Sequence, residues 1–313
     1  MKTLAVNVGS FTVDIIAYDL PRIARPGEIV YVEGPINLHV GGHAVNVSID
    51  LVKLGRVTNV AAVGAAGDDV FAKIIKDELS RYGIKVYTQV VKEVGTARNV
   101  ILVVKGEDRR FHIYKGANPY LKASFILGVI SDLKPNYLYL ALGVSDDVDN
   151  NVTSIVAKLK AENSLALLDM AYISHNSINA LLKVLNQVDV VHLNEYEALS
   201  ITNTDSISRA ITLLNELRPK LLLITRGERG VIALYRGYLI DQPPYRVRAK
   251  DPTGAGDSFA GGIIGYIAKK EDACVNNIKL GIIMGSAIAS FTVESFSLNR
   301  LSKINIKDIE EFK

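Results

Sequence analysis

The 313-residue chain has almost no cysteine and no surplus of charge, and both features narrow what it can be. Its single cysteine, Cys274, excludes an intramolecular disulfide framework, and with only five histidines it also excludes a Cys-rich zinc site. The 36 Lys and Arg residues are balanced by 33 Asp and Glu residues without any Lys/Arg block, so no nucleic-acid surface is expected. Small molecules are the expected partners, and a reducing cytoplasm is the simplest setting.

Long apolar runs of the kind that target or anchor a chain are absent as well. Residues 1–9 indicate a short strand and a turn, without the apolar core and small-residue cleavage site of a signal peptide. The longest apolar run, at 280–293, is too short to cross a bilayer, so a core helix and no membrane association are predicted. What the chain does have is an apolar content of 49%, and its length fits one large α/β core with a small appendage.

The most informative stretch is 250–265, where a glycine-containing loop runs into apolar residues at helical spacing. This pattern predicts a buried helix whose first turn contains Gly254, Ala255 and Gly256. The first N–H groups of a helix have no internal partners, so a phosphate can bind to them. Asp257 in the same turn would repel that phosphate unless it orients a hydroxyl for attack on phosphorus. The alternative is an Asp that merely favours the positive end of a helix.

The stretch Asp251-Pro-Thr-Gly-Ala-Gly-Asp257-Ser-Phe-Ala-Gly-Gly262 resembles the C-terminal signature of the ribokinase-like carbohydrate kinases, the PfkB family. In that family the Gly-Ala-Gly-Asp turn holds the transferring phosphate and its Asp is the catalytic base, which implies that role for Asp257. The resemblance also implies ATP and Mg²⁺ as cofactors, with Asp251 as a candidate ligand of a monovalent cation. The segment 295–299 lacks the small-residue turn that is common near that cation site, which puts the cation in doubt.

Two features of the N-terminal part indicate the acceptor site. Asp14 follows the first predicted strand, where open α/β sheets place their ligands, although a surface turn is the alternative. The stretch Gly41-Gly42-His43-Ala-Val-Asn46 opens a helix and resembles the family's Gly-Gly-x-x-x-Asn signature, which lines the sugar pocket. An amide such as Asn46 both donates and accepts, which suits adjacent hydroxyls of a neutral polyol. His43 stands where phosphosugar kinases usually have Lys, which favours an unphosphorylated acceptor.

Between these motifs the alternation of strands and helices is interrupted. Residues 27–40 alternate as a short hairpin would, and three more short strands are predicted at 86–91, 98–104 and 110–114. We expect segments of about 13–40 and 86–115 to form a small β-sheet lid over the sugar site. Its exposed face is expected to be covered by a second subunit, giving a homodimer. Arg98 falls where some family members have a substrate-contacting Arg, and a surface Arg is the alternative.

In the second half of the chain the alternation resumes, which predicts a doubly wound α/β fold with a mainly parallel sheet flanked by helices. The stretch Asn194-Glu-Tyr-Glu197 resembles the family's Asn-x-x-Glu motif. This resemblance implies that Asn194 lies near the nucleotide and that Glu197 organises Mg²⁺ through water. The stretch Thr225-Arg-Gly227-Glu-Arg-Gly230 matches the family's nucleotide-contacting turn, which implies that role for its Thr and two Gly residues.

Other enzyme classes fit less well. The chain has no Gly-Lys dipeptide, which a P-loop requires, and Phe259 is too bulky for a Rossmann glycine turn. The spacing around Ser258 does not match a hydrolase nucleophile elbow. We therefore expect residues 1–313 to form one ATP-dependent phosphotransferase acting on a hydroxyl of a small unphosphorylated sugar. A nucleoside kinase of the same family is one alternative, and a catalytically inactive kinase-fold binding or regulatory protein is another.

Overall fold

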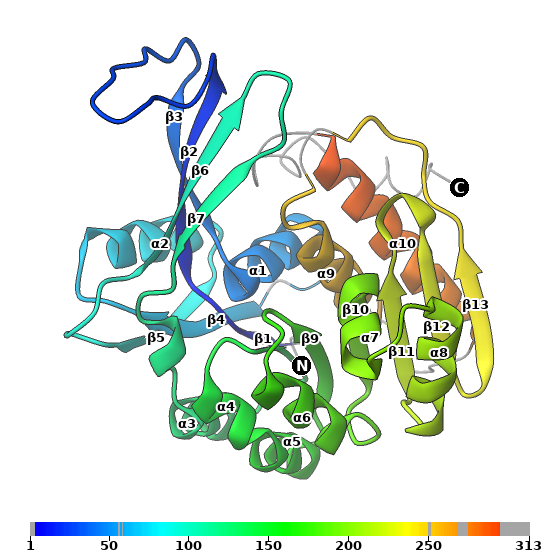
Figure 1. Cartoon of the computed structure of the whole chain (residues 1–313). Coiled ribbons are helices and arrows are strands. Elements are labelled where there is room, and N and C mark those ends of the chain that lie inside the picture. Colours follow the sequence, from blue (N-terminus) through cyan, green and yellow to red (C-terminus); the bar gives the residue numbers. More distant parts are fainter. Residues whose placement is uncertain (1–3, 56, 58, 250–251, 268–274, 295–313) are drawn as a thin grey trace.

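The computed structural model describes residues 4–55, 57, 59–249, 252–267 and 275–294. Within these ranges one large sheet contains β1 (Leu4–Val8), β4 (Asn59–Ala66), β5 (Lys85–Val90), β8 (Tyr137–Leu142), β9 (Leu165–Met170), β10 (Val190–Asn194), β11 (Leu221–Thr225), β12 (Val231–Tyr235) and β13 (Tyr238–Gln242). Their order across the sheet is β13-β12-β11-β10-β9-β8-β1-β4-β5. Strands β1 to β11 of this sheet are parallel, and β12 and β13 add an antiparallel hairpin at one edge. The predicted α/β fold with a mainly parallel sheet is confirmed (Figure 1).

Helices cover both faces of this sheet, because its parallel strands are apolar on both sides. On one face lie α1 (His43–Lys53), α2 (Val70–Arg81), α9 (Ala255–Ile267) and α10 (Val275–Val293). On the other face lie α3 (Ala123–Leu133), α4 (Asp146–Asn150), α5 (Val152–Ala161), α6 (His175–Val184), α7 (Glu195–Thr202) and α8 (Ile207–Glu216). The core helix predicted at 280–293 is α10, and no helix in the described part of the chain is long and apolar enough to span a membrane.

Helix α9 is buried between its neighbours α1 and α10, as Figure 1 shows. Glycines allow this close packing, since a Cβ atom at Gly262 would lie 2.7 Å from the Cα of Gly285 on α10. A Cβ atom at Gly261 would lie 3.3 Å from Asp50 on α1. The predicted buried helix is therefore confirmed. Because α9 is packed against its neighbours along its whole length, the position of its first turn is fixed as well.

A second, smaller sheet projects from the corner near β4 and β5 (Figure 1). It has the order β3-β2-β6-β7, with β2 (Thr12–Leu20), β3 (Ile36–Gly41), β6 (Ala97–Val104) and β7 (Arg110–Tyr114). Phe11, which precedes β2, is only 1% exposed and packs against Gly64 of β4, where any side chain would meet its ring. The link between the two sheets is thus anchored in the core.

Two predicted strands need correction. The strand expected in the lid at 86–91 is β5, which pairs in parallel with β4 and belongs to the large sheet. It does so because α2 connects β4 to β5 in a βαβ unit, and Tyr87 of β5 packs against the main core. The hairpin expected within 27–40 is formed by β2 and β3 instead, since the residues from 27 to 35 are not in a strand.

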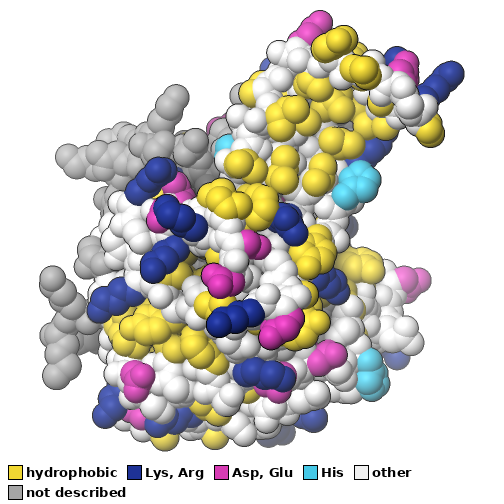
Figure 2. Space-filling model, turned by 90° about the vertical axis from the view of Figure 1, so that its left-hand side faces the viewer, with side chains coloured by type: hydrophobic (Ala, Val, Ile, Leu, Met, Phe, Trp, Pro, Cys, Tyr) yellow, Lys and Arg dark blue, Asp and Glu magenta, His cyan; other side chains and the backbone are white. Residues whose placement is uncertain are grey.

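One face of the small sheet is apolar and exposed. Ile36 and Leu38 of β3 and Val100 of β6 are 65%, 53% and 41% exposed. Strand pairing aligns Val100 and Leu38 with Ile15 of β2, so all of them lie on the face opposite Asp14. Figure 2 shows hydrophobic side chains gathered on the projecting part of the molecule. We call these residues, Ile15, Ile36, Leu38 and Val100, the outer face of the small sheet.

Candidate active site

The first turn of α9 follows a tight turn at Pro252. Gly254 has a φ of 74°, a left-handed conformation that glycine adopts without strain. Gly254 and Gly256 line a cavity of about 280 Å³ at the carboxyl ends of the parallel strands. The Ala255 N–H instead donates to the Pro252 carbonyl at 3.1 Å and closes the turn. With its N–H engaged in the turn, Ala255 is not available as a phosphate donor in this arrangement, and the assignment of Gly254 and Gly256, which line the cavity, stays a prediction.

Asp257 reaches into the same cavity from α9 and is only 8% exposed. Its Oδ2 accepts a hydrogen bond of 2.7 Å from Asn46 Nδ2 on α1, and Tyr139 Oη lies 3.5 Å from its Oδ1. Burial raises the pKa of Asp257, and the nearby charge of Asp169 raises it further. A carboxylate with a raised pKa and a fixed orientation is suited to accept a proton from a hydroxyl.

Behind Asp257 lies a buried polar network to which the sequence analysis gave no role. Tyr139 Oη donates to Asp169 Oδ2 at 2.9 Å, and His192 Nδ1 lies 3.1 Å from Asp169 Oδ1. Burial alone would lower the pKa of His192, but the charge and hydrogen bond of Asp169, together with the charges of Glu197 and Asp257, raise it. Burial likewise opposes ionisation of Asp169, yet His192 brings its pKa below the usual value. The signal in the sequence was a polar residue inside each of two otherwise apolar strands, β9 and β10.

Asn194 and Glu197 form the N-terminal cap of α7 and line the same cavity. Asn194 Oδ1 accepts from the Glu197 N–H at 2.9 Å, and Glu197 Oε2 accepts from the Asn194 N–H at 2.7 Å. Burial raises the pKa of Glu197 to about 7, and Asp169 adds to the effect. Within the described residues no three His, Cys, Asp or Glu side chains are arranged to hold a metal ion together. A cation near Glu197 would therefore need other oxygen ligands, such as phosphate and water.

A larger cavity of about 860 Å³ adjoins this one, and Thr225 and Gly256 line both. The predicted nucleotide residues Thr225, Gly227 and Gly230 all line the larger cavity. Gly230 has a φ of 78°, and a Cβ atom there would lie 2.1 Å from the Gln242 carbonyl oxygen, so only glycine fits. The two cavities meet beside the start of α9.

The predicted acceptor residues come together from β2, β3 and α1, and Asn99 of β6 joins them. Asp14 Oδ1 accepts a 2.7 Å hydrogen bond from Asn99 Nδ2. Gly41 leaves room for this carboxylate, since a Cβ atom there would lie 2.8 Å from Asp14 Oδ2. The buried Oδ1 atoms of Asn46 and Asn99 have no hydrogen-bond partner among the described residues. Each can accept from a hydroxyl group of a ligand.

Gly42 and His43 at the start of α1 pack against Ser10, and His43 lines the smaller cavity. Gly42 has a φ of 96° and lies so close to the Ser10 carbonyl that a Cβ atom would be 2.3 Å from its oxygen. His43 Nδ1 lies 2.8 Å from Ser10 Oγ, and its ring meets Tyr172 edge-on at 6.5 Å between centroids. Close approach therefore requires glycine at both positions of the predicted pair, and at Gly42 the positive φ requires it as well.

One predicted site residue, Arg98, is not brought to this site. Arg98 lies on the same face of the small sheet as Val13, opposite Asp14, and its guanidinium stacks between the rings of Phe71 and Tyr114, 4.8 and 5.1 Å from their centroids. The prediction of a substrate contact is therefore wrong for Arg98 in this arrangement, and the neighbouring Asn99 takes that position. Asp251 lies outside the described residues.

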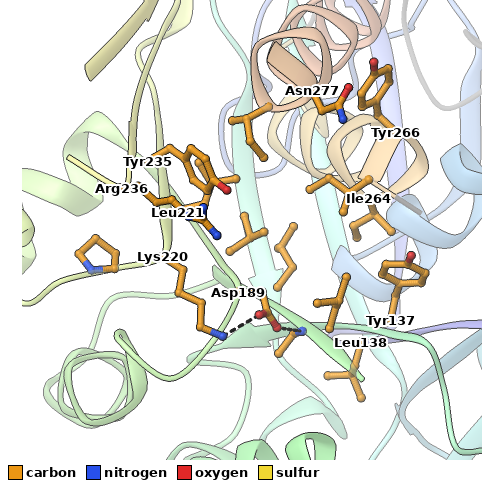
Figure 3. A pocket seen from close by; sticks show the side chains of 17 residues that line it. Tyr137, Leu138, Asp189, Lys220, Leu221, Tyr235, Arg236, Ile264, Tyr266 and Asn277 are labelled. Carbon is orange, nitrogen blue, oxygen red and sulfur yellow. Dashed lines mark hydrogen bonds and ion pairs between the residues drawn. The ribbon is translucent and has the colours of Figure 1, made fainter. Parts of the chain in front are cut away.

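A third cavity, of about 480 Å³, lies at the opposite, amino ends of the parallel strands. Figure 3 shows it lined mainly by apolar side chains, with Tyr137, Tyr235 and Tyr266 around it and Lys220 paired to Asp189. The Lys220 to Asp189 distance is 2.8 Å. This cavity shares no lining residue with the other two.

Comparison with known proteins finds relatives over most of the chain. A family model described as pfkB family carbohydrate kinase matches residues 2–304. The deoxyribokinase of Salmonella typhi is 28% identical over 275 residues, covering 85% of this chain and 86% of that protein. The cytidine kinase of Thermococcus kodakarensis is 40% identical over 88 residues, covering 27% of this chain and 31% of that protein. The structure of ribokinase from Giardia lamblia covers 100% of this chain and 98% of its own, with a TM-score of 0.83 and 21% sequence identity.

Proposed function

Because the chain belongs to the pfkB family of carbohydrate kinases, we propose that it transfers the γ-phosphate of ATP to a hydroxyl of a small unphosphorylated sugar. The observation that carries this proposal is the place of Asp257. Its buried carboxylate lies where the cavity of about 280 Å³ at the start of α9 approaches Asn46 of the acceptor site. A base between donor and acceptor is what in-line transfer to a hydroxyl requires.

We assign each group of residues at the site a separate role in the reaction. ATP, when bound with Mg²⁺, supplies the phosphoryl group and the cation that screens its charge. Asn46 Nδ2 holds Asp257 Oδ2, so that the carboxylate is oriented and can take the proton of the acceptor hydroxyl. The first turn of α9 presents backbone N–H groups to the developing negative charge. Thr225, Gly227 and Gly230 line the cavity that is large enough for the nucleotide.

Glu197 is proposed to bind Mg²⁺ through water. Its carboxylate is 9% exposed and lines the phosphate cavity with Asn194, and the raised pKa shows that burial disfavours its charge. A nearby divalent cation would favour the ionised form and reverse that penalty. A monovalent cation at Asp251 stays a prediction that no described residue supports.

Recognition of an unphosphorylated acceptor rests on charge and hydrogen bonding. Asp14 is anionic and would repel a phosphate ester, while the amides of Asn46 and Asn99 offer acceptors for hydroxyl protons. His43 rather than Lys borders the site. A nucleoside is the second candidate acceptor, favoured by the 40% identity to a cytidine kinase over 88 residues. A cytoplasmic location, where ATP is abundant, suits either acceptor.

The test is an ADP-release assay on the purified chain with pentoses, hexoses, nucleosides and their phosphate esters. We expect turnover on a free sugar or nucleoside to exceed turnover on every phosphate ester. Faster turnover on fructose 6-phosphate than on any free compound would contradict the acceptor proposal. Nucleotide binding without turnover on any acceptor would instead favour the inactive, regulatory alternative.

The outer face of the small sheet is proposed to pair with the same face of a second subunit. Ile36, Leu38 and Val100 form a contiguous exposed apolar surface, which monomeric proteins rarely keep. Light scattering at micromolar concentration should give the mass of a dimer, and Leu38→Lys should give a monomer. A strict monomer for the unaltered chain would end this proposal.

A further inference from the structure

A second buried polar cluster lies next to the catalytic turn, and the reaction described above gives it no role. It consists of Asp50 on α1, Ser258 on α9 and Thr292 on α10, which are 1%, 1% and 2% exposed. None of these three residues lines the cavity that contains Asp257 or the larger cavity beside it. A carboxylate is rarely buried to this degree without polar groups around it, so its contacts are informative.

Hydrogen bonds connect the three side chains across the three helices, of which α9 is the middle one in Figure 1. Ser258 Oγ donates to Asp50 Oδ2 at 2.7 Å, and Thr292 Oγ1 donates to Ser258 Oγ at 2.9 Å. The single proton of the Ser258 hydroxyl is thus directed at a carboxylate oxygen, which is a stronger acceptor than a neutral oxygen. Ser258 is therefore held by both neighbours of α9.

Helix α1 also holds the catalytic base. Asn46 lies four residues before Asp50 on α1, so the two side chains share one face of that helix. Asn46 Nδ2 donates to Asp257, and Asp50 accepts from the next residue, Ser258. Two successive turns of α1 thus hold two successive residues of α9. Because successive residues point about 100° apart around a helix axis, the two bonds together oppose rotation of α9 about its axis.

We propose that Ser258 and Asp50 are positioning residues, which fix the rotation of the first turn of α9 and thereby aim the Asp257 carboxylate at the acceptor hydroxyl. This inference rests on the phosphotransfer proposed above. Asp257 has to meet a hydroxyl of a substrate that other elements also bind, so a small rotation of α9 changes the distance and the angle of proton transfer. Ser258 and Asp50 touch no reacting atom and act through Asp257.

Ser48 on α1 is a matched control for Ser258. It is fully buried, and its Oγ accepts a hydrogen bond of 2.8 Å from Asn7 Nδ2 of β1. Ser48→Ala and Ser258→Ala each remove one buried hydroxyl and one hydrogen bond of similar length. The bond of Ser48 runs to the large sheet and not to α9, so it does not restrain Asp257. A merely structural loss would therefore appear in both variants.

The first experiment measures steady-state kinetics of the full chain with ATP, Mg²⁺ and its best acceptor, below the melting temperature of every variant. For Ser258→Ala we expect kcat to fall about tenfold, with both KM values changed less than about twofold, because Ser258 lines neither cavity. Asp50→Asn keeps an oxygen acceptor for the hydroxyl, so its kcat should fall only about threefold. Ser48→Ala should keep kcat within about twofold even where its melting temperature falls as far as that of Ser258→Ala.

The second experiment tests whether Ser258 acts through Asp257. Asp257→Asn no longer takes the proton of the acceptor, so its residual rate should not depend on where this side chain points. In the Asp257→Asn background, Ser258→Ala should therefore lower kcat by less than about twofold, against about tenfold in the unaltered chain. A hydroxyl that only stabilises the fold would have the same effect in both backgrounds.

The results that overturn the inference differ from those that overturn the proposed function. If the unaltered chain phosphorylates an acceptor and Ser258→Ala matches Ser48→Ala in kcat, the positioning role fails while the function stands. An equal fall in kcat in both backgrounds would also end it. If Ser258→Ala does not fold, Asp50→Asn decides, and an unchanged kcat for that variant overturns the inference. If the unaltered chain transfers phosphate to no acceptor, the proposed function fails and the positioning role fails with it.

Discussion

The two ends of the large sheet carry cavities of very different character. At the amino ends lies the cavity of about 480 Å³, lined mainly by apolar side chains and bordered by the half-exposed Lys220. At the carboxyl ends lies a cavity of only about 280 Å³, into which Asp169, His192 and Asp257 converge from three elements. All three are less than 10% exposed.

The difference shows that a cluster of buried ionisable side chains is a better guide to the active site than the volume of a cavity is. An apolar hollow where helix ends meet strand starts costs its lining dispersion contacts, but it brings no cluster of buried charges together. Burying several ionisable groups together is costly unless each finds a partner, and such groups concentrate at functional sites. Parallel strands all end at one edge, so only that edge can collect side chains from many βα loops. The comparison can be tested at both ends.

The largest effect is expected for Asp257→Asn. Removing the base should lower turnover by roughly two to four decades, while nucleotide affinity and melting temperature stay nearly unchanged. The kinetic assay, nucleotide titration and thermal unfolding are measured on the same preparation. A folded variant that keeps most of its phosphorylation rate would show that Asp257 only caps its helix, at a cost of about 1 kcal/mol.

A smaller effect, in stability, is expected for His192→Gln. The pKa of His192 is raised by Asp169, so the ion pair stabilises the folded state fully below the unfolded pKa of about 6.5 and less as pH rises through the folded value. The free energy of unfolding should fall by about 3 kcal/mol at pH 5.5, and by less at pH 8.5. The exposed His175→Gln is the control for urea unfolding at both pH values. An equal loss at both pH values would contradict a protonated His192.

The smallest effect is expected at the amino-end cavity. Lys220 is 54% exposed and pairs with Asp189, so Lys220→Ala should change the free energy of unfolding by less than about 1 kcal/mol. Turnover should stay within about twofold, because no lining residue in the described part of the chain is shared between this cavity and that of Asp257. A marked loss of activity, measured in the same assay, would mean that the two ends of the sheet are coupled and that the comparison fails.

The parts of the site that were predictable are encoded in short contiguous stretches. A reader of the sequence can recognise the turn before Asp257 and the pair Gly41 and Gly42, because tight turns and close backbone approach restrict which residue types fit there. Ala255 was assigned to the phosphate with its neighbours because spacing does not show which N–H groups the turn consumes. Local pattern thus predicts where a turn lies better than which of its atoms are available.

The parts of the site and fold that were not predicted depend on strand register and on the order of strands in the sheets. The register of β6 against β2 decides whether Arg98 or Asn99 faces the acceptor site. A shift of one residue would move every side chain of the strand to the opposite face of the sheet. The strand at 85–90 joined the large sheet because of its partner β4, although its own sequence resembled the lid strands. Asp169 and His192 meet only because β9 and β10 are neighbours, a long-range fact that no single stretch contains.

The position of β1 has a consequence for how the chain acquires its structure during synthesis. β1 is made first but pairs with both β4 and β8, so its second neighbour emerges only after residue 137. Helix α9, which carries Asp257, follows well over a hundred residues later, on the order of ten seconds at ribosomal rates of about 5–20 residues per second. Until then the nascent chain can hold a growing sheet but no base, so no phosphotransfer is expected before α9 has been made.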